Sequence, residues 1–558
     1  MNIFTIYKNK IFNILKDLNR KNKIILPENL NSINVDIPPK NFDADISTNA
    51  CMILAKKNNK KPEEISNLII DDLSKQDKNI LSSEFVNPGF INIKFNRKFW
   101  NYFLKEISKT IKTFGSNKTK DKNKYLIEFV SANPTGPLHV GHCRGAILGD
   151  VISNLLIFNG KSVKKEYYIN DHGNQIIDFT KSVYFRIIEI KKKKAFPDDE
   201  NLYPGDYIKD IAKKILKKKK FNYENFDKIY HKLSKECIKE SMNFIKDDLK
   251  KLGIKHDNFV SESNLIKKDE VKKTINFLEK KKLVFKNENK LWFKSSFFGD
   301  DKDRALQKDD KTWSYFAGDV GYHKNKINRK FNKLINILGA DHTGYIKRIS
   351  YAVEALTGSK DYLNCKVSQL VKLIKGGEPF KMSKRKGDYI TVDDLVKEVG
   401  KDPARFIMLG RNSDVELVFN FESVKEKTKD NPLFYVQYCF ARINSILSKS
   451  KSKNKKPILK NDYQFNDEEI KIIKKLSEWP LCLEISTKKL EPHRIPIFLF
   501  ELASEFHSYW NLGKQDFSKK FIDENNRINN NKLAFLNIIS TTIKLGMNII
   551  GVSTPNKM

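Results

Sequence analysis

Two histidines that flank a valine and a glycine, in the motif HVGH at positions 139–142, are the strongest local signal for chemistry in this chain. The run YLIEFV before the motif has the apolar composition of a short buried strand, and the residues after it are apolar at helical spacing. The motif is therefore predicted at the carboxyl end of a strand, where parallel sheets bind ligands and a helix N-terminus offers N–H groups to phosphate. Its glycine lets a flat base approach the backbone, and its imidazole rings can donate hydrogen bonds to phosphate oxygens.

A second motif, KMSK at positions 381–384, lies far downstream and is followed by Arg385 and Lys386. The turn-rich approach KGGEPF predicts a loop, and lysine on a loop is a flexible point charge that can neutralise a departing pyrophosphate. Taken singly, HVGH is also compatible with a metal-binding pair or with chance, and KMSK with a solvated loop. Together, and in this order and spacing, they make a chance occurrence remote.

A parallel α/β architecture is expected around these motifs because strand patterns alternate with helical ones. Strand patterns occur at 125–130, 161–170, 335–338 and 365–374, and a helical pattern at 143–160. A lysine-rich stretch of helical pattern, 191–290, separates the second strand from the third and predicts an insertion. Its lysine runs are typical of a solvated helix face.

The two ends of the chain differ from this centre. The first segment contains FVNPGFINIKF, in which side chains alternate after a Pro-Gly turn, as in a strand. The polar stretch 115–124 predicts a linker, and the segment from 431 has long helical patterns. We therefore expect an α+β domain at 1–113, a Rossmann-type α/β core at 121–430 with a helical insertion around 190–290, and an all-α domain at 431–558.

The composition limits the class of protein. The net charge of +36 favours a polyanion partner such as nucleic acid, although a lysine- and asparagine-rich composition alone would produce the same excess. The six cysteines are scattered without a CxxC pair, so neither a structural zinc site nor a disulfide framework is expected. No apolar run has the roughly 18–20 residues of a membrane helix, and the N-terminus lacks a signal-peptide pattern. These features predict a cytoplasmic protein without a membrane partner.

The two motifs resemble the HIGH and KMSKS signatures of class I aminoacyl-tRNA synthetases. Four flanking segments resemble the arginyl-tRNA synthetases within that class, and the likeness covers nearly the whole chain: EFVSANPTGPLHVGH, YYINDHGNQ, SYFAGDVGYH and NPLFYVQYCFARI. The resemblance implies an arginine–tRNA ligase, which activates L-arginine with ATP, releases pyrophosphate and transfers arginine to the 3′-terminal adenosine of tRNA(Arg). It also implies an anticodon-binding C-terminal domain and a tRNA-contacting N-terminal domain. We expect Mg²⁺ to arrive with ATP, no tightly bound cofactor, no metal held by the protein and a monomer.

The resemblance implies a role for each matching residue. The catalytic residues would be His139, His142, Lys381 and Lys384. ATP would be bound by His139, Gly141, His142, Met382 and Lys384, and arginine by Glu128, Asn133, Tyr315 and Asp319, with Asp171 as a weaker candidate. Two carboxylates suit the planar fork of donors in a guanidinium, and a lysine substrate would leave part of such a site unpaired. Taken alone, Glu128 would be read as an ordinary salt bridge at a strand end.

The residues that the resemblance places against tRNA lie in the two end domains. In the first domain they are Asn87, Phe90 and Asn92, and in the last they are Tyr438 and Arg442. An aromatic ring with amides nearby is what an unstacked base requires. The alternative for such aromatics is core packing, as it is for His507, Tyr509 and Trp510 further along.

One departure from the family bears on activity. Many arginyl-tRNA synthetases lack a standard KMSK and carry a lysine three residues before the first histidine, whereas here that position is Gly136 and KMSK is intact. The open alternatives are a class I synthetase for glutamate or cysteine, a non-catalytic RNA-binding paralogue and a nucleotidylyltransferase. Glu128 and Asp319 weigh against an acidic substrate, the scattered cysteines against a cysteine enzyme, and the two motifs against the paralogue.

Overall fold

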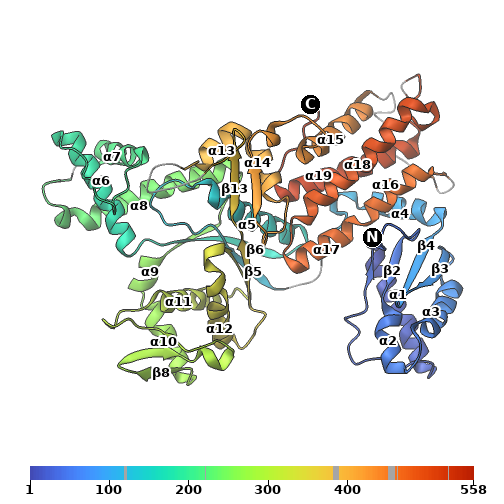
Figure 1. Cartoon of the computed structure of the whole chain (residues 1–558), viewed down its shortest axis with the longest axis horizontal. Coiled ribbons are helices and arrows are strands. Elements are labelled where there is room, and N and C mark those ends of the chain that lie inside the picture. Colours follow the sequence, from blue (N-terminus) through green and yellow to red (C-terminus); the bar gives the residue numbers. More distant parts are fainter. Residues whose placement is uncertain (119–121, 220, 381–388, 450–458, 461–462, 526) are drawn as a thin grey trace.

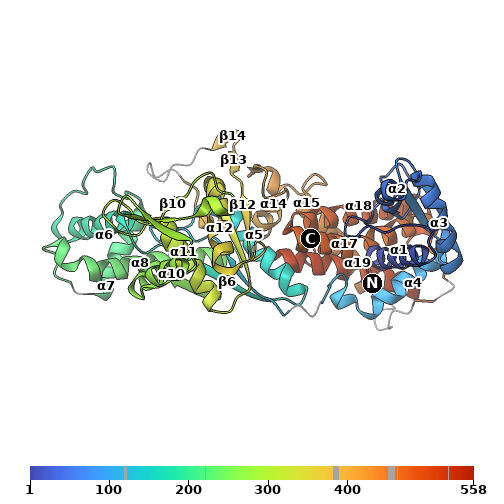
Figure 2. The same ribbon diagram turned by 90° about the horizontal axis from the view of Figure 1, so that it is seen from below.

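The computed structural model describes residues 1–558 except 119–121, 220, 381–388, 450–458, 461–462 and 526. The molecule is elongated, with a group of helices at one end, a parallel sheet in the middle, and C-terminal helices beside the N-terminal domain at the other end (Figures 1 and 2). The first and last segments of the sequence therefore lie next to each other, on the same side of the sheet.

The central sheet has five parallel strands in the order β12-β11-β5-β6-β7. These strands are β5 (Lys124–Glu128), β6 (Ser162–Ile169), β7 (Asn258–Ser261), β11 (Lys333–Gly339) and β12 (Leu363–Ser368). The chain enters at the middle strand β5, extends to one edge through β6 and β7, and then returns to the other side of β5. This reversal opens a crevice at the carboxyl ends of the strands, where α/β sheets bind ligands. The predicted Rossmann-type α/β core is confirmed, as are the first three strand predictions.

Two predictions about this core are wrong in part. The run 365–374 is not one strand, because it leaves β12, turns at Gln369, and enters β13 (Val371–Lys375) in a separate three-stranded sheet with β14 (Glu378–Phe380) and β15 (Leu417–Asn420). The stretch 191–290 is not wholly helical, because β7 lies within it and pairs with β6 in the central sheet. Four residues at a sheet edge are too short for a periodic signal, and a continuous apolar run does not reveal a change of sheet.

Helices surround the central sheet in two groups. Helix α5 (Val140–Phe158) follows β5 and packs against β6 and β11. Beyond β6, α6 (Asn174–Lys192), α7 (Asp206–Lys218) and α8 (Phe226–Lys251) pack around an apolar core of their own. A second core joins α9 (Glu262–Lys267), α10 (Glu270–Lys280), α11 (Tyr315–Asn328) and α12 (Ile346–Thr357) to the small sheet of β8 (Val284–Asn287), β9 (Lys290–Phe293) and β10 (Arg304–Ala305).

The N-terminal domain is α+β, as predicted. Its sheet has the order β1-β2-β4-β3 and is covered by helices; the elements are α1 (Ile3–Arg20), β1 (Val35–Asp36), β2 (Ile46–Thr48), α2 (Ala50–Asn58), α3 (Pro62–Gln76), β3 (Ile80–Val86), β4 (Phe90–Phe95) and α4 (Arg97–Lys109). The alternation predicted for β4 holds for Ile91, Ile93 and Phe95, but Asn92 between them is also buried. As an inner strand, β4 is hydrogen-bonded along both edges, to β2 and to β3.

The C-terminal segment is helical throughout its described long elements, as predicted. After α13 (Val392–Val399) and α14 (Lys401–Met408) come α15 (Pro432–Lys449), α16 (Asp467–Ser477), α17 (Trp479–Lys489), α18 (Arg494–Gln515) and α19 (Asn530–Ile550). Trp479 donates from its indole to the Phe114 carbonyl at 3.0 Å, which ties α17 to the end of the N-terminal domain. Among the described residues, α19 alone is long and apolar enough to span a membrane, and 72% of that apolar window is buried inside the protein.

Candidate active site and tRNA interface

The HVGH motif forms the N-terminal cap of α5. His139 is the cap residue, its Nδ1 accepts from the Gly141 N–H at 3.2 Å, and His142 Nδ1 accepts from the His139 N–H at 3.3 Å. The two imidazole rings lie side by side with centroids 3.8 Å apart, and Gly141 is exposed. The motif thus presents two rings and a helix N-terminus at the carboxyl end of β5, as the sequence predicts.

The loop before the motif is held by helices of the insertion. The Tyr207 hydroxyl donates to the Thr135 carbonyl at 3.1 Å, the Ser241 hydroxyl accepts from the Gly136 N–H at 3.0 Å, and a carboxylate of Asp248 accepts from the Leu138 N–H at 2.9 Å. Gly136 has φ +152°, and a side chain there would meet the Tyr207 ring at 2.7 Å. Burial raises the pKa of Asp248 to about 6. The sequence patterns did not predict these three supports, because they come from α7 and α8.

The predicted residues Lys381, Met382 and Lys384 lie outside the described residues. The segment that follows them returns to the HVGH motif: the Ile390 carbonyl accepts from the Val140 N–H, and the Leu138 carbonyl accepts from the Val392 N–H, both at 3.0 Å. Residues 390–392, downstream of the KMSK motif, are therefore paired with the cap of α5.

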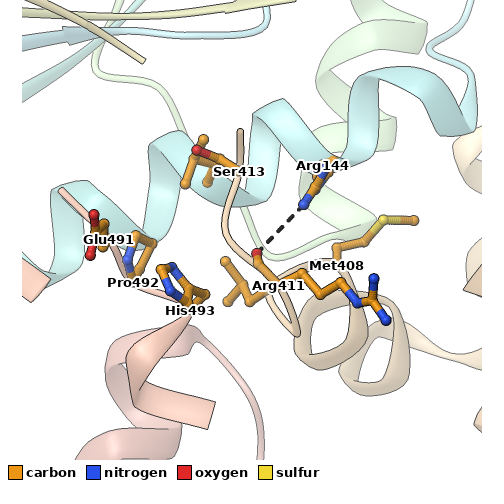
Figure 3. Close-up of a pocket in the computed structure, with 9 residues that line it drawn as sticks. Arg144, Met408, Arg411, Ser413, Glu491, Pro492 and His493 are labelled. Carbon is orange, nitrogen blue, oxygen red and sulfur yellow. Dashed lines mark hydrogen bonds between the residues drawn. The ribbon is translucent and has the colours of Figure 1, made fainter. Parts of the chain in front are cut away.

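Buried arginines anchor α5 along its length. Arg144 donates to the carbonyls of Val415 at 2.6 Å and Asn412 at 2.8 Å, and more weakly to that of Arg411, within a small cavity that Glu491 and His493 also line (Figure 3). One turn and a half further on, Asp150 accepts from Arg405 at 2.6 Å. Arg405 also donates to the Ile550 carbonyl at 2.8 Å, at the end of α19. The helix that carries the motif is thus bonded to the C-terminal domain.

A pocket of about 400 Å³ opens at the carboxyl ends of β5, β6 and β11. It brings together three of the predicted arginine-binding residues, Glu128, Tyr315 and Asp319. Asn133 does not line the pocket, but its amide oxygen accepts at 3.0 Å from Asn170, which does. The residues that the sequence missed are Tyr168, Glu262, His342 and Tyr345. Glu262 directly follows β7, so recognising that short strand would have revealed it.

The acids of this pocket are perturbed by burial. Burial raises the pKa of Asp319 to about 6, although a hydrogen bond from Tyr345 at 2.5 Å opposes the shift. Burial, followed by the charges of Asp319 and Asp171, raises the pKa of Glu262 to about 7. Asp171 itself does not line the pocket, because its carboxylate accepts from Ser261 at 2.6 Å and Ser263 at 2.9 Å at the β7–α9 junction. The structure therefore gives Asp171 a structural contact in place of the ligand contact considered above.

The predicted tRNA residues of the N-terminal domain share one pocket. Asn87, Phe90 and Asn92 line a hollow of about 330 Å³ together with Ser47 and Asn49. The Asn92 Nδ2 atom is buried and has no hydrogen-bond partner among the described residues. A buried, unpaired amide donor costs free energy unless a ligand satisfies it. Phe90 is half-buried and lines this hollow, so part of it is accessible to a ligand.

The predicted tRNA residues of the C-terminal domain form a stack. The Arg442 guanidinium lies 4.3 Å from the Tyr438 ring centroid and donates to its hydroxyl at 2.6 Å. It also lies 5.1 Å from the ring of Trp510, which lines a pocket of about 360 Å³ with Phe521 and three lysines. Tyr509, in contrast, is 1% exposed and is a core residue, as the alternative reading holds.

Comparisons with known proteins agree with one another. The chain matches the family models for an arginyl tRNA synthetase N-terminal domain at 6–95, a class I (R) tRNA synthetase catalytic domain at 106–445, and a DALR anticodon binding domain at 436–558. It is 57% identical to an arginine–tRNA ligase of Pelagibacter ubique over 100% of both chains, and 38% identical to one of Roseobacter denitrificans over 96% of both. The solved arginyl-tRNA synthetase of Thermus thermophilus superposes with a TM-score of 0.76 at 17% identity, over 99% of this chain and 100% of that one, which shows a shared fold.

Proposed function

We propose roles for individual residues in the reaction of this protein. The premise is that the chain belongs to the arginyl-tRNA synthetase family and is an arginine–tRNA ligase. In the first step the arginine carboxylate attacks the α-phosphate of ATP, and pyrophosphate leaves. In the second, a ribose hydroxyl of the terminal adenosine of tRNA(Arg) takes the arginyl group from the adenylate. No covalent bond to the protein is needed, so the protein positions the reactants and stabilises charge.

One observation carries the arginine site: Glu128, Asp319 and Glu262 converge in a pocket at the end of the strand that leads to the HVGH cap. The guanidinium would lie between Glu128 and Asp319, because its planar fork can meet acceptors on two sides. Tyr315 would cover it at the mouth, where 77% of the ring is exposed. Asn133, held beside the pocket through Asn170, would face the backbone end of arginine.

ATP would lie over the cap of α5. His139 and His142 would donate to its phosphates, and exposed Gly141 leaves room for the adenine to approach the backbone. Lys381, Met382 and Lys384 would approach from the chain that continues into the segment paired with this cap. Mg²⁺ would enter bound to ATP as part of the substrate, since this ion keeps most of its ligands from phosphate and water.

The two end domains would contact tRNA(Arg). In the N-terminal domain, Phe90 would stack on an unpaired base while Asn87 and the unpaired amide of Asn92 hydrogen-bond its edge. In the C-terminal domain, Tyr438 and Arg442 would stack on an anticodon base. The proposed boundaries remain 1–113, 121–430 and 431–558. A monomer in the cytoplasm also stays a prediction, which sedimentation and cell fractionation would test.

Pyrophosphate exchange with each amino acid, with and without tRNA(Arg), tests the proposal. Of the amino acids, only arginine should support exchange. The variant Glu128→Gln should raise the KM for arginine while leaving the KM for ATP unchanged. Exchange with another amino acid would contradict the arginine site, and equal changes in both KM values would contradict the role of Glu128.

A further inference from the structure

A fully buried lysine occupies one side of the carboxylate that is proposed to bind arginine. The Lys326 side chain is 0% exposed, lies on α11, and pairs through Nζ with Oε2 of Glu128 at 2.5 Å. Lys326 does not line the arginine pocket, whereas Glu128 does. The other carboxylate oxygen, Oε1, accepts from the Ser131 hydroxyl at 3.1 Å. Lys326 therefore approaches Glu128 from behind and leaves Oε1 on the side that carries the pocket.

Lys326 is the donor end of a hydrogen-bond chain that runs from the Glu128 carboxylate to the backbone carbonyl of Asp319. Its ammonium also donates to the Asn336 Oδ1 at 3.2 Å, Asn336 Nδ2 meets His323 Nε2 at 3.0 Å, and His323 Nδ1 meets the Asp319 carbonyl at 2.8 Å. The last carbonyl can only accept, so Nδ1 carries the proton and Nε2 accepts from Asn336. This arrangement requires a neutral His323, in keeping with burial, which lowers its pKa well below the ordinary value.

The charge of Lys326 also matters because three carboxylates share this pocket. Asp319 and Glu262 face the same pocket as Glu128, and burial already raises the pKa of Asp319 to about 6 and that of Glu262 to about 7. A third buried carboxylate with no counter-charge would also bind a proton near neutral pH, because like charges and burial both disfavour ionisation. Lys326 supplies that counter-charge from a position where it does not fill the pocket.

The other groups around Glu128 cannot replace Lys326. Besides it, the charged and titratable groups that face Glu128 among the described residues are Asp319 and Tyr322 on α11, Arg329 at its C-terminal cap, Glu166 and Tyr168 on β6, and Cys365 on β12. The only cation among them, Arg329, is bound at 2.6 and 2.8 Å to both oxygens of buried Glu166. Its charge is thus already matched by a second acid.

We propose that Lys326 is a positioning residue for arginine: it keeps Glu128 ionised and orients the carboxylate so that one oxygen is left for the guanidinium. This inference rests on the proposed role of Glu128 as an arginine ligand. Lys326 does not touch arginine itself. Its effect on the reaction should therefore appear in arginine binding and in the pH dependence of that binding, and not in ATP binding.

The test is the pH profile of the KM for arginine in pyrophosphate exchange, with tRNA(Arg) present, for the full-length variant Lys326→Met. We expect this KM to rise about tenfold at pH 7 and to fall again as pH is raised toward 9. Without its counter-ion the Glu128 carboxyl of the variant should bind a proton near neutral pH, and a carboxyl whose pKa lies about one unit above the assay pH is ionised in roughly one molecule in ten. The KM for ATP should stay within about twofold of the wild type. A profile for Lys326→Met that runs parallel to the wild-type profile would overturn the proposal.

Three further variants separate the possible explanations. Lys326→Gln keeps a hydrogen-bond donor but not the charge, and it should show the same displaced profile even where Lys326→Met folds poorly. Lys326→Met combined with Glu128→Gln should have the profile of Glu128→Gln alone, because no carboxylate remains to titrate. Lys165→Met removes another largely buried lysine, from Asp150 outside the pocket, and should leave the profile unchanged.

The two levels of the proposal fail in different ways. If Glu128→Gln leaves the KM for arginine unchanged, the role of Glu128 is wrong and Lys326 has no ligand to position. If Glu128→Gln raises that KM but both Lys326 variants retain the wild-type profile, Glu128 binds arginine without help from Lys326. If Lys165→Met displaces the profile as much as Lys326→Met does, the effect reports a loss of buried charge in general.

Discussion

The pocket proposed for arginine and the N-terminal hollow proposed for tRNA satisfy their polar groups in opposite ways. In the arginine pocket the acids are bonded within the protein: Asp319 accepts from Tyr345, and Glu128 accepts from Ser131 and Lys326. In the N-terminal hollow the Asn92 Nδ2 atom is buried without a partner among the described residues. One region is organised in advance, whereas the other keeps a donor free.

This difference matches what each ligand demands. A small cation that must be told from lysine requires acceptors fixed in direction and charge, because misplacement by a fraction of an ångström loses the geometry of the fork. A base within a large RNA is brought in by many other contacts, so one free donor and one aromatic ring can read it. We therefore expect changes in the arginine pocket to act steeply on a single KM, and changes in the hollow to act mildly on tRNA binding.

The largest effect is expected from Asp319→Asn, which removes the charge and keeps the shape. The KM for arginine should rise by about 100-fold or more, because losing one partner of a buried charge pair costs about 2–5 kcal/mol. The KM for ATP should not change. Asp171→Asn is the matched control, since this nearby acid is bonded to Ser261 and Ser263 and does not line the pocket. An equal rise in the KM for arginine and the KM for ATP in Asp319→Asn would contradict the assignment of Asp319 to the arginine site.

The pH dependence of the wild-type enzyme should show the next effect. Because burial raises the carboxyl pKa values of Asp319 to about 6 and Glu262 to about 7, both acids gain protons as pH falls through this range and lose their attraction for a guanidinium. The KM for arginine should therefore rise about tenfold per pH unit below pH 6. Glu262→Gln should remove the part of the rise between pH 7 and 6. A KM that stays flat down to pH 5 would contradict the assignment of both acids.

The KM for tRNA(Arg) should not show this rise at acid pH. Among the described residues, no carboxylate is hydrogen-bonded to Tyr438 or Arg442. The neighbouring His507 is held neutral by burial, which lowers its pKa to about 4. The KM for tRNA(Arg) should accordingly vary by less than about twofold between pH 6 and 8. A tRNA dependence that follows the arginine curve would show that the two regions are coupled.

The parts of this molecule that sequence could predict are those whose signal is local. The strands at 125–130 and 335–338, the cap formed by HVGH, and the helical C-terminal segment all follow from periodicity and capping in a single window. The family relationship, predicted from two motifs and their flanks, is confirmed along the full chain.

The parts that sequence could not predict depend on contacts between distant segments. Tyr207, Ser241 and Asp248 support the loop before HVGH from another pair of helices, and no pattern in their own windows distinguishes them from ordinary helix residues. Lys326 sits in a helix among other lysines, and only the fold shows that it is fully buried against Glu128. Asp171 is the opposite case. It lies in a polar motif close to the pocket, but in the structure its carboxylate accepts a hydrogen bond from Ser261.

A moderate effect is expected in the hollow of the N-terminal domain. Asn92→Ala should raise the KM for tRNA(Arg) by about fivefold to tenfold, since a hydrogen bond from a neutral donor contributes roughly 1 kcal/mol. Arginine-dependent pyrophosphate exchange at saturating tRNA should be unaffected. A tRNA(Arg) transcript with an abasic residue in place of the contacted base should bind wild type and variant alike. If the variant still discriminates against the abasic transcript, the base lies elsewhere.

The smallest effect is expected on the stability of the C-terminal domain, at acid pH. His507 Nε2 faces the Tyr435 carbonyl at 3.2 Å and therefore carries the proton, so its Nδ1 accepts from Arg442 at 2.9 Å and cannot be protonated without meeting that guanidinium. Burial, with the charge of Arg442, lowers the pKa of His507 to about 4, whereas in the unfolded chain it is about 6.5. Between these values the unfolded state binds the additional proton, so stability is lost as pH falls from 6.5 toward 4, by at most about 1.4 kcal/mol per pH unit. The melting temperature of His507→Gln should therefore fall less steeply than that of the wild type as pH is lowered. Parallel curves of melting temperature against pH would show that His507 does not set the acid response of the C-terminal domain.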